Sequence, residues 1–450
     1  MVARLPIQRC VCSAFLALLL AFISGATSLF GQDDSLPAPD LEKRWDFHAQ
    51  ATVIPQGHGD FRALYSGPNS LSPYTEVATS VTSTFYLGRK LWEGGEIYVN
   101  PEILAGEGLS STLGLAGFSN GEIYRVDTPR PKLTLARLFI RQSWQLGGWE
   151  ENLKDDLNQF PCQCRSSRIT LTLGKFSLVD LFDDNTYSHD ARTQFLNWSL
   201  MDNGAWDFAA DTRGYTYGIA VEADKACWSL RYASVLMPKF ANGMPMDLHI
   251  DKARADNLEL ERRHKLKGHA GALRPMAYLN HAHMGNFRTT LDTPAYGMDI
   301  TRSRTYTRKY GFGLNGEQEL TGGVGVFFRG GWNDGHTESF AFTEIDRTGS
   351  GGISVNGRYW NRKEDTFAVA FVANGISKDH REYLQAGGRG FIIGDGKLNY
   401  GKEEILEAYY SIAARWGVSV SPDFQFVEHP AYNRDRGPVA IYALRFHWER

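Results

Sequence analysis

The C-terminal fifty residues alternate between apolar and polar side chains with a period of two. Between 418 and 427, one face carries Val418, Val420, Pro422, Phe424 and Phe426, and the other carries Ser419, Ser421, Asp423, Gln425 and Val427. Successive side chains of a strand point to opposite faces, so this pattern predicts a strand between an apolar and an aqueous environment. The segments 403–415 and 438–448 show the same alternation, and Trp416-Gly417 is predicted to form a tight turn.

The same period predicts further strands along the rest of the chain. They are expected at 45–54, 76–88, 94–105, 133–146, 168–176, 213–224, 226–237, 256–264, 270–283, 308–320, 323–333, 352–361 and 366–374. Together with the three C-terminal segments this makes sixteen. The segment 256–264 is weakly patterned, so fourteen or eighteen strands are the alternatives.

The predicted connections alternate between short and long. Short links such as 321–322 and 416–417 alternate with long ones such as 106–132, 177–212 and 375–402. This asymmetry is typical of a transmembrane antiparallel β-barrel with short periplasmic turns and long extracellular loops, and the even strand number leaves both ends of the barrel on the short-turn side. The link 147–167 is long where a short turn is expected. A soluble all-β protein is the alternative fold class, because soluble sheets alternate as well.

The N-terminal segment resembles a secretory signal. Arg4 and Arg9 precede an apolar run from Cys12 to Ile23, and small residues follow at Ala26 and Ser28. We therefore expect a signal peptide at 1–32 and an outer-membrane barrel domain at 33–450. Nothing after residue 32 approaches the roughly 18 consecutive apolar residues of a membrane-spanning helix.

Composition agrees with an exported barrel. Aromatic residues make up 13% of the chain and charged residues 22%, with 46 Gly and a formal net charge of −3. This balance suggests no nucleic-acid partner. Three cysteines follow the signal, Cys162, Cys164 and Cys227, which allows at most one internal disulfide. A bond from Cys227 to one member of the pair and free thiols are the two main alternatives, and the spacing fits no standard metal site.

The segment 177–212 combines many polar groups with Trp198 and Trp206. A barrel of about sixteen strands is wide enough for an aqueous channel, so a selective channel needs a loop folded inward to narrow it. Inward faces of the strands add charges of both signs, among them Glu96, Glu102, Glu319 and Arg415. The candidate residues for the pore lining or constriction are Arg137, Arg141, Asp183, Asp184, Arg192, Trp206, Glu317, Arg329, Glu403, Glu407, Asp423 and Arg445.

Mixed donors and acceptors beside aromatic rings suit a neutral polyhydroxylated solute. The plainer alternatives are that the wall charges pair with one another and that 177–212 is a solvated external loop. An enzyme is not expected: no G-x-S-x-G element occurs, and His281-Ala282-His283 has no evident third metal ligand. No cofactor is expected either.

Several motifs resemble the carbohydrate-selective porins of Gram-negative outer membranes. They are 403–410 (EEILEAYY), Trp416, 421–427 (SPDFQFV), 106–110 (GEGLS), 173–176 (LGKF), 315–321 (NGEQELT) and 329–335 (RGGWNDG). The resemblance implies a sixteen-stranded channel whose third loop and inward charges form a sugar-selective constriction.

The expected function is thus passive, selective diffusion of mono- or oligosaccharides across the bacterial outer membrane. The expected partners are carbohydrate solutes, outer-membrane lipid and the barrel-assembly machinery, with a monomer or a homotrimer as the assembly. An anion or general small-solute porin is one alternative function, motivated by Arg137, Arg141 and Arg329. A barrel-anchored enzyme or adhesin is the other.

Overall fold

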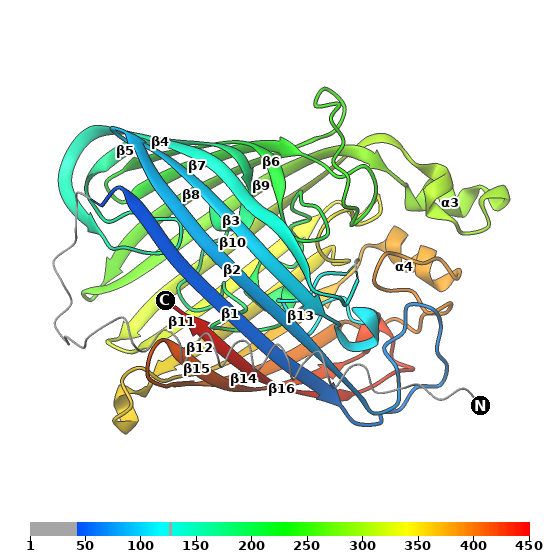
Figure 1. Ribbon diagram of the computed structural model, residues 1–450. Coiled ribbons are helices and arrows are strands. Elements are labelled where there is room, and N and C mark those ends of the chain that lie inside the picture. Colours follow the sequence, from blue (N-terminus) through cyan, green and yellow to red (C-terminus); the bar gives the residue numbers. More distant parts are fainter. Residues whose placement is uncertain (1–42, 126–127) are drawn as a thin grey trace. The chain divides into compact units, whose positions relative to one another are not determined.

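The computed structural model describes residues 43–125 and 128–450. Within these residues sixteen antiparallel strands each pair with their neighbours in the sequence, and β1 pairs with β16 to close the barrel (Figure 1). Closure leaves no open sheet edge, so every strand can satisfy its backbone hydrogen bonds inside a membrane. The fold prediction is confirmed, whereas the predicted signal peptide lies outside the described residues.

The strands are β1 (Trp45–His58), β2 (Glu76–Trp92), β3 (Gly95–Gly106), β4 (Lys132–Leu153), β5 (Cys162–Phe176), β6 (Thr216–Lys225), β7 (Trp228–Leu236), β8 (Arg254–Leu266), β9 (His269–Met284), β10 (Thr305–Thr321), β11 (Val324–Asn333), β12 (Arg347–Asn356), β13 (Thr366–Gly375), β14 (Glu403–Ala413), β15 (Val418–Glu428) and β16 (Val439–Glu449). Short helices lie in the connections. They are η1 (Leu109–Ser111), η2 (Leu178–Asp180), α2 (Trp198–Met201), α3 (Phe287–Asp292), η3 (Pro294–Tyr296), η4 (Ile300–Ser303), η5 (Gly357–Trp360), α4 (Lys378–Gln385) and η6 (Pro430–Tyr432). Among the described residues, no helix is long and apolar enough to cross a membrane.

The alternation predicted for the C-terminal strands is the alternation observed. On β16, Tyr442 and Phe446 are exposed on the outer face of the barrel, and Arg445 between them is buried inside. Trp416 and Gly417 both have positive φ, at 62° and 74°, which is the backbone of a tight hairpin turn between β14 and β15. Because β14 ends at Ala413, Arg415 lies in this turn and is exposed. Its predicted place on the inner wall was therefore wrong.

The strand predicted at 352–361 is displaced. β12 covers Arg347–Asn356, and the residues that follow form the short helix η5. The segment from 347 to 352 is rich in Gly, Ser and Thr, so it resembled a loop in the sequence. In the barrel these small residues are needed, because a Cβ at Gly352 would come within 2.5 Å of the Phe327 ring and 2.7 Å of Ala370.

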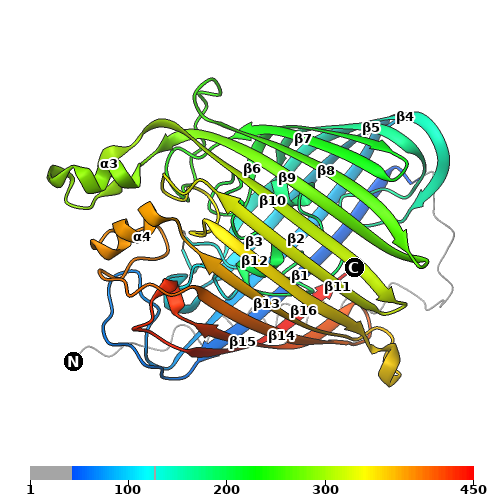
Figure 2. The same ribbon diagram turned by 180° about the vertical axis from the view of Figure 1, so that it is seen from behind.

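The long link at 147–167 is mostly a hairpin. β4 and β5 continue to Leu153 and from Cys162, so only 154–161 remains as the connection. In Figures 1 and 2 the paired strands curl over at the short-turn end of the barrel. The alternation of short and long connections therefore holds at this position as well, and the predicted exception was wrong.

Candidate functional site

The third long loop, residues 177–215, folds into the lumen. Arg329 on β11 is fully buried and holds this loop from the wall. Its Nε lies 2.9 Å from Asp183 Oδ2, and its two terminal nitrogens donate to the carbonyls of Leu200 (2.8 Å), Asp183 (3.0 Å) and Ser188 (2.6 Å). A guanidinium offers five donors in a rigid fork, which suits it to fix several carbonyls at once. The predicted infolding of this loop is confirmed.

Two glutamates of β14 hold loop backbone from the other side. Glu407 accepts hydrogen bonds from the N–H groups of Leu196 and Asn197 in the third loop. Glu403 accepts from Ala116 (3.0 Å), Gly117 (2.6 Å) and Ala431 (2.8 Å). Ala116 and Gly117 belong to the second long loop, residues 107–131, so this loop also folds inward.

The sixth long loop, residues 334–346, completes the filling. Asp207 of the third loop accepts from the N–H groups of Phe340 (2.8 Å) and Ala341 (2.7 Å), and it lies 3.0 Å from the ammonium of Lys309 on β10. The ring of Phe342 stacks on Trp198, with 5.7 Å between centroids. Three loops thus form a compact core inside the barrel and leave only part of the lumen open.

The open part is a cavity of about 750 Å³ between this core and strands β1–β4. Arg192 of the third loop crosses it: Nε donates to Glu122 (2.8 Å), Nη1 to the Tyr86 hydroxyl (3.2 Å) and Nη2 to Glu102 (3.2 Å). The Tyr215 hydroxyl donates to Glu102 as well, at 3.0 Å. The cavity is therefore bordered by a connected network of charged and hydroxyl groups.

Arg137 on β4 forms a second charged pair at the cavity. It makes a two-pronged contact with Asp180, at 2.7 and 2.5 Å, and its guanidinium lies 5.2 Å from the centre of the Tyr215 ring. Burial tends to raise the pKa of Asp180, but Arg137 outweighs it, so this pKa lies below its usual value. Arg141, four residues further along β4 on the same face, donates to the Asn158 carbonyl at 2.8 Å.

The cavity wall carries more acid than base. Four arginines line it against eight carboxylates: Arg137, Arg141, Arg192 and Arg213, and Glu102, Glu122, Asp156, Asp180, Asp184, Asp190, Asp202 and Asp211. Most of these acids are paired, but both carboxylate oxygens of Asp202 are buried without a hydrogen bond. Burial raises the pKa of Asp202 to about 7, against the opposing effect of His189, whose Nδ1 is 3.6 Å away.

The twelve predicted site residues fall into two groups. Four line the cavity: Arg137, Arg141, Asp184 and Arg192. The other eight lie away from it, on the wall or inside the loop core: Asp183, Trp206, Glu317, Arg329, Glu403, Glu407, Asp423 and Arg445. Arg445, for example, donates to the Ala191 carbonyl, and the indole N–H of Trp206 donates to Asn257.

Several cavity residues were not among the candidates. Tyr86 lies on the inward face of β2, where alternation alone would place it, but a tyrosine offered no charge to single it out. Glu122 and Tyr124 belong to the second loop, which was not predicted to fold inward. The apolar side chains of that loop, Leu115 and Phe118, are fully buried and were the available signal.

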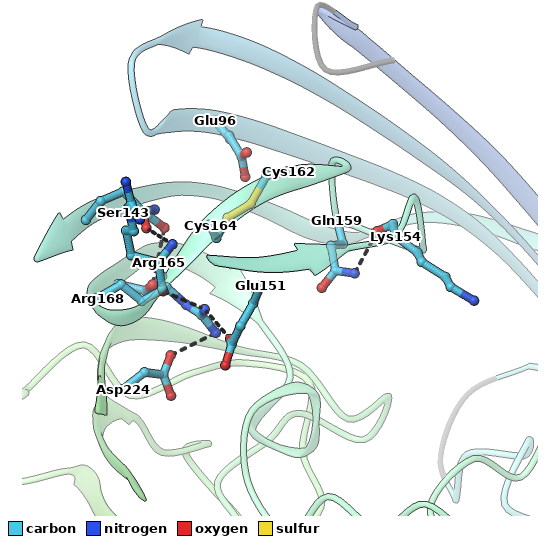
Figure 3. Close-up of a disulfide and its surroundings, with 12 residues drawn as sticks. Glu96, Ser143, Glu151, Lys154, Gln159, Cys162, Cys164, Arg165, Arg168 and Asp224 are labelled. Atoms are coloured by element: carbon cyan, nitrogen blue, oxygen red, sulfur yellow. Dashed lines mark hydrogen bonds and ion pairs between the residues drawn. A yellow bond between two sulfur atoms is a disulfide. The ribbon is translucent and has the colours of Figure 1, made fainter. Parts of the chain in front are cut away.

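The connection between β4 and β5 closes part of the cavity from the short-turn end. Residues 156–159 line the cavity, and Asn158 exchanges side-chain hydrogen bonds with Asn100 on β3. Figure 3 shows the base of this hairpin, where Arg168 is within 3.4 Å of Glu151 and 3.0 Å of Asp224. At its tip, the Lys43 ammonium lies 2.7 Å from Asp155.

The hairpin also contains the disulfide. Cys162 is bonded to Cys164, and Cys227 is a free thiol (Figure 3). The predicted maximum of one disulfide is confirmed, whereas the alternative that pairs Cys227 was wrong. The Cys227 sulfur instead contacts the guanidinium of Arg262.

Comparisons with known proteins agree with this geometry. The family model described as "Carbohydrate-selective porin, OprB family" matches residues 69–449. The high-pH structure of Pseudomonas putida OprB is similar in fold, with a TM-score of 0.69, 15% identity, and coverage of 91% of this chain and 95% of that chain. Acinetobacter baumannii OccAB1 has a TM-score of 0.48 and 10% identity over 92% of this chain and 99% of that chain, which is too distant to add to the argument. A search of curated proteins finds no match.

Proposed function

Because this chain belongs to the carbohydrate-selective porin, OprB family, it forms an outer-membrane channel for carbohydrates, and we propose that the cavity beside β1–β4 is its selective constriction. The short-turn end of such barrels faces the periplasm and the long loops face the outside. The resemblance found in the sequence is thereby confirmed. Family and fold imply a channel rather than an enzyme.

The observation that supports the constriction is the network around Arg192. Its guanidinium, the Glu102 carboxylate and the Tyr86 hydroxyl place charged donors and acceptors within a few ångströms of one another. A sugar carries hydroxyls that donate and accept, and it can exchange hydrogen bonds with both partners of such a pair. Hydrogen bonds to charged groups contribute about 1.5–3 kcal/mol each, which is enough for selection but weak enough for release.

The aromatic rings of the wall supply the second requirement. Tyr124, Phe139, Trp198, Phe208 and Tyr215 contribute to the cavity lining. Ring faces accept the C–H side of a pyranose, while the polar groups take its hydroxyls. The volume of about 750 Å³ lies within the roughly 300–1,000 Å³ typical of small-molecule sites. This range favours mono- or short oligosaccharides as the solutes.

The charge of the wall argues against the anion alternative. With eight carboxylates against four arginines, an anion would enter a region of opposing potential, whereas an uncharged sugar would not. Arg329, part of the motive for that alternative, is buried under the third loop and does not line the cavity.

The test is a single-channel recording of the wild-type protein in planar bilayers. We expect dose-dependent block of the ionic current by neutral sugars and no preference for anions in a salt gradient. Replacing the cavity carboxylate with Glu102→Gln should weaken the sugar block about tenfold, in line with the loss of one charged hydrogen bond. Arg89→Gln, a variant on the outer face of β2, serves as the matched control. A strongly anion-selective pore that ignores sugars would overturn the proposal.

Three expectations about processing and partners stay predictions. These are a signal peptide at 1–32, the barrel-assembly machinery as a partner, and a monomer or a homotrimer as the assembly.

A further inference from the structure

Two arginines and a histidine lie side by side on the outer face of the barrel. Arg254 on β8 pairs in register with His281 on β9, and His281 pairs in register with Arg308 on β10. These positions alternate with the buried residues of their strands, so all three side chains point away from the lumen. Figure 2 shows β8, β9 and β10 as neighbours on one side of the barrel.

The row lies where the outer face changes from apolar to polar. Two steps further into the membrane, in register, Leu258 and Phe312 flank Ala277 and are about half exposed. In the other direction, Tyr306 and His283 face each other with ring centres 5.2 Å apart, and the long loops begin. Tyrosines at such a boundary are typical of the headgroup region of a membrane. Because the long loops face outward from the cell, this is the headgroup region of the outer leaflet.

The two arginines have few partners within the protein. Asp256 lies 3.0 Å from Arg254 Nε, which leaves both terminal nitrogens of that guanidinium available. Within the described residues, neither the guanidinium of Arg308 nor the ring of His281 makes a hydrogen bond or an ion pair with another side chain. The two arginines lie on either side of the histidine and repel each other across it, which is a cost to the fold. An anion from outside the protein would remove that cost.

The row has a hollow beside it. Tyr232, Ser234, Ile250, Asp251, Arg254 and Asp256 enclose an open depression of about 450 Å³ on the outer face. Its hydroxyl and carboxylate groups can bond the hydroxyls of a sugar. A ligand that joins a phosphate to a sugar and to acyl chains therefore matches the row, the hollow and the apolar strip below them.

We propose that Arg254, His281 and Arg308 bind a phosphate of lipid A, the phosphorylated glycolipid of the outer leaflet. Cationic clusters at a membrane surface recognise anionic headgroups. The two guanidinium groups, with the histidine between them, can each donate charge-assisted hydrogen bonds to a phosphate that lies over the row. The site depends on the orientation of the barrel in the outer membrane and not on its sugar selectivity.

The test uses the purified full-length channel in detergent or nanodiscs with bis-phosphorylated lipid A as the probe. Native mass spectrometry or a fluorescent lipid A titration would report binding to the wild type, Arg308→Gln and the double variant Arg254→Gln/Arg308→Gln. We expect binding to weaken about fivefold for each arginine removed. Arg89→Gln, an outward arginine near the opposite rim, is the matched control and should bind lipid A as the wild type does.

Additional ligands in the same binding assay identify the source of the phosphate. Fully dephosphorylated lipid A should bind all variants equally and weakly, and inorganic phosphate alone should not protect the protein against thermal unfolding. Equal binding by Arg308→Gln and the wild type would overturn the proposal, as would equal binding of phosphorylated and dephosphorylated lipid A. If the binding of phosphatidylglycerol depends on Arg308 to the same extent, the site binds anionic headgroups in general and the lipid A assignment fails. Sugar block and conductance of each variant should match the wild type, which verifies that the channel is folded.

Discussion

On one side of the lumen, Glu403, Glu407 and Arg329 are bound to loop backbone and do not line the cavity, whereas on the other side Glu102 and Arg192 line it. Both sets are inward-facing charges on strands or on an infolded loop. The difference is whether a loop lies against them. On the first side, which we call the anchored side, carboxylates accept hydrogen bonds from loop N–H groups, and a guanidinium donates hydrogen bonds to loop C=O groups. On the cavity side, the same chemistry remains available to a solute.

The two sides should therefore respond differently to mutation. A fully buried charge that loses its partner destabilises a fold by about 3–5 kcal/mol. A charge at the edge of an aqueous cavity can be rehydrated, so its loss should change binding more than stability. The variants that follow test this division, beginning with the largest expected effect.

Arg329→Met tests the anchored side by removing its buried guanidinium. It removes five donors from a buried site and leaves the Asp183 carboxylate without its cation. We expect the third loop to leave its position at a cost of about 3–5 kcal/mol, with a larger single-channel conductance and loss of sugar block. Conductance and block measured in planar bilayers check both effects. Unchanged conductance would show that the loop does not depend on this arginine.

Lys309→Met tests the link between the third and sixth loops. Asp207 would keep its bonds from Phe340 and Ala341 but lose the buried ammonium. The expected loss is about 3 kcal/mol, the lower end of the range for a buried charge, because Asp207 keeps its two backbone donors, and it is measured by urea unfolding in lipid vesicles. The double variant Lys309→Met/Asp207→Asn should recover part of it, because it leaves no unpaired charge. If the double variant is less stable than the sum of the single variants, the charge pair is not the cause.

Asp202 lines the cavity and is fully buried, as Glu102 is, but neither of its carboxylate oxygens has a hydrogen bond. Its pKa is raised from 3.8 to about 7, so the folded protein holds a proton that the unfolded chain releases. Stability should then fall as the pH rises from about 4 to 7 and stay low above that. Asp202→Asn should be more stable than the wild type by about 1–3 kcal/mol at pH 8 and similar to it near pH 4. Parallel unfolding curves at all pH values would contradict this.

Arg192→Gln tests the side of the lumen that lines the open cavity. Glu102 keeps its bonds from Thr84 and Tyr215, so we expect a folded channel of near-normal stability. Sugar affinity should fall about tenfold, the equivalent of one charged hydrogen bond, and the preference for cations should increase. Current block by sugars and reversal potentials in a salt gradient measure both. A stability loss as large as that of Arg329→Met would remove the distinction between the two sides.

The smallest effect is expected at the disulfide. Cys162 and Cys164 enclose a loop of only three residues, so the bond restricts the unfolded chain little. Cys162→Ser/Cys164→Ser should cost at most about 1.5 kcal/mol and leave conductance unchanged. Urea unfolding of the wild type with and without reductant offers the same comparison without mutation. A clear rise in conductance would mean that the bond positions the hairpin at the periplasmic mouth.

The sequence predicted the strands of the barrel wall better than the loops that fill the lumen. Alternation depends on two neighbouring environments, so it located each strand. It displaced β12, where Gly and Ser serve close packing against Phe327, and it missed the extensions of β4 and β5. Which inward charge meets a loop depends on contacts between residues far apart in the chain. Arg137 and Arg329 looked equivalent in the sequence, yet one lines the cavity and the other is covered. Trp206 resembled a pore aromatic but packs against Phe182 inside the loop core.

The bonds from Glu407 to the third loop also set an order of events during assembly. Glu407 is 211 residues from Leu196, and Glu403 is 287 residues from Ala116, so these two anchors come from the last quarter of the chain, after Arg329 on β11. The loops are therefore made long before the strand that holds them. Contacts of such separation form late. A barrel stalled before β14 would therefore have its third loop bound by Arg329 but would lack the bonds from Glu403 and Glu407 to the second and third loops.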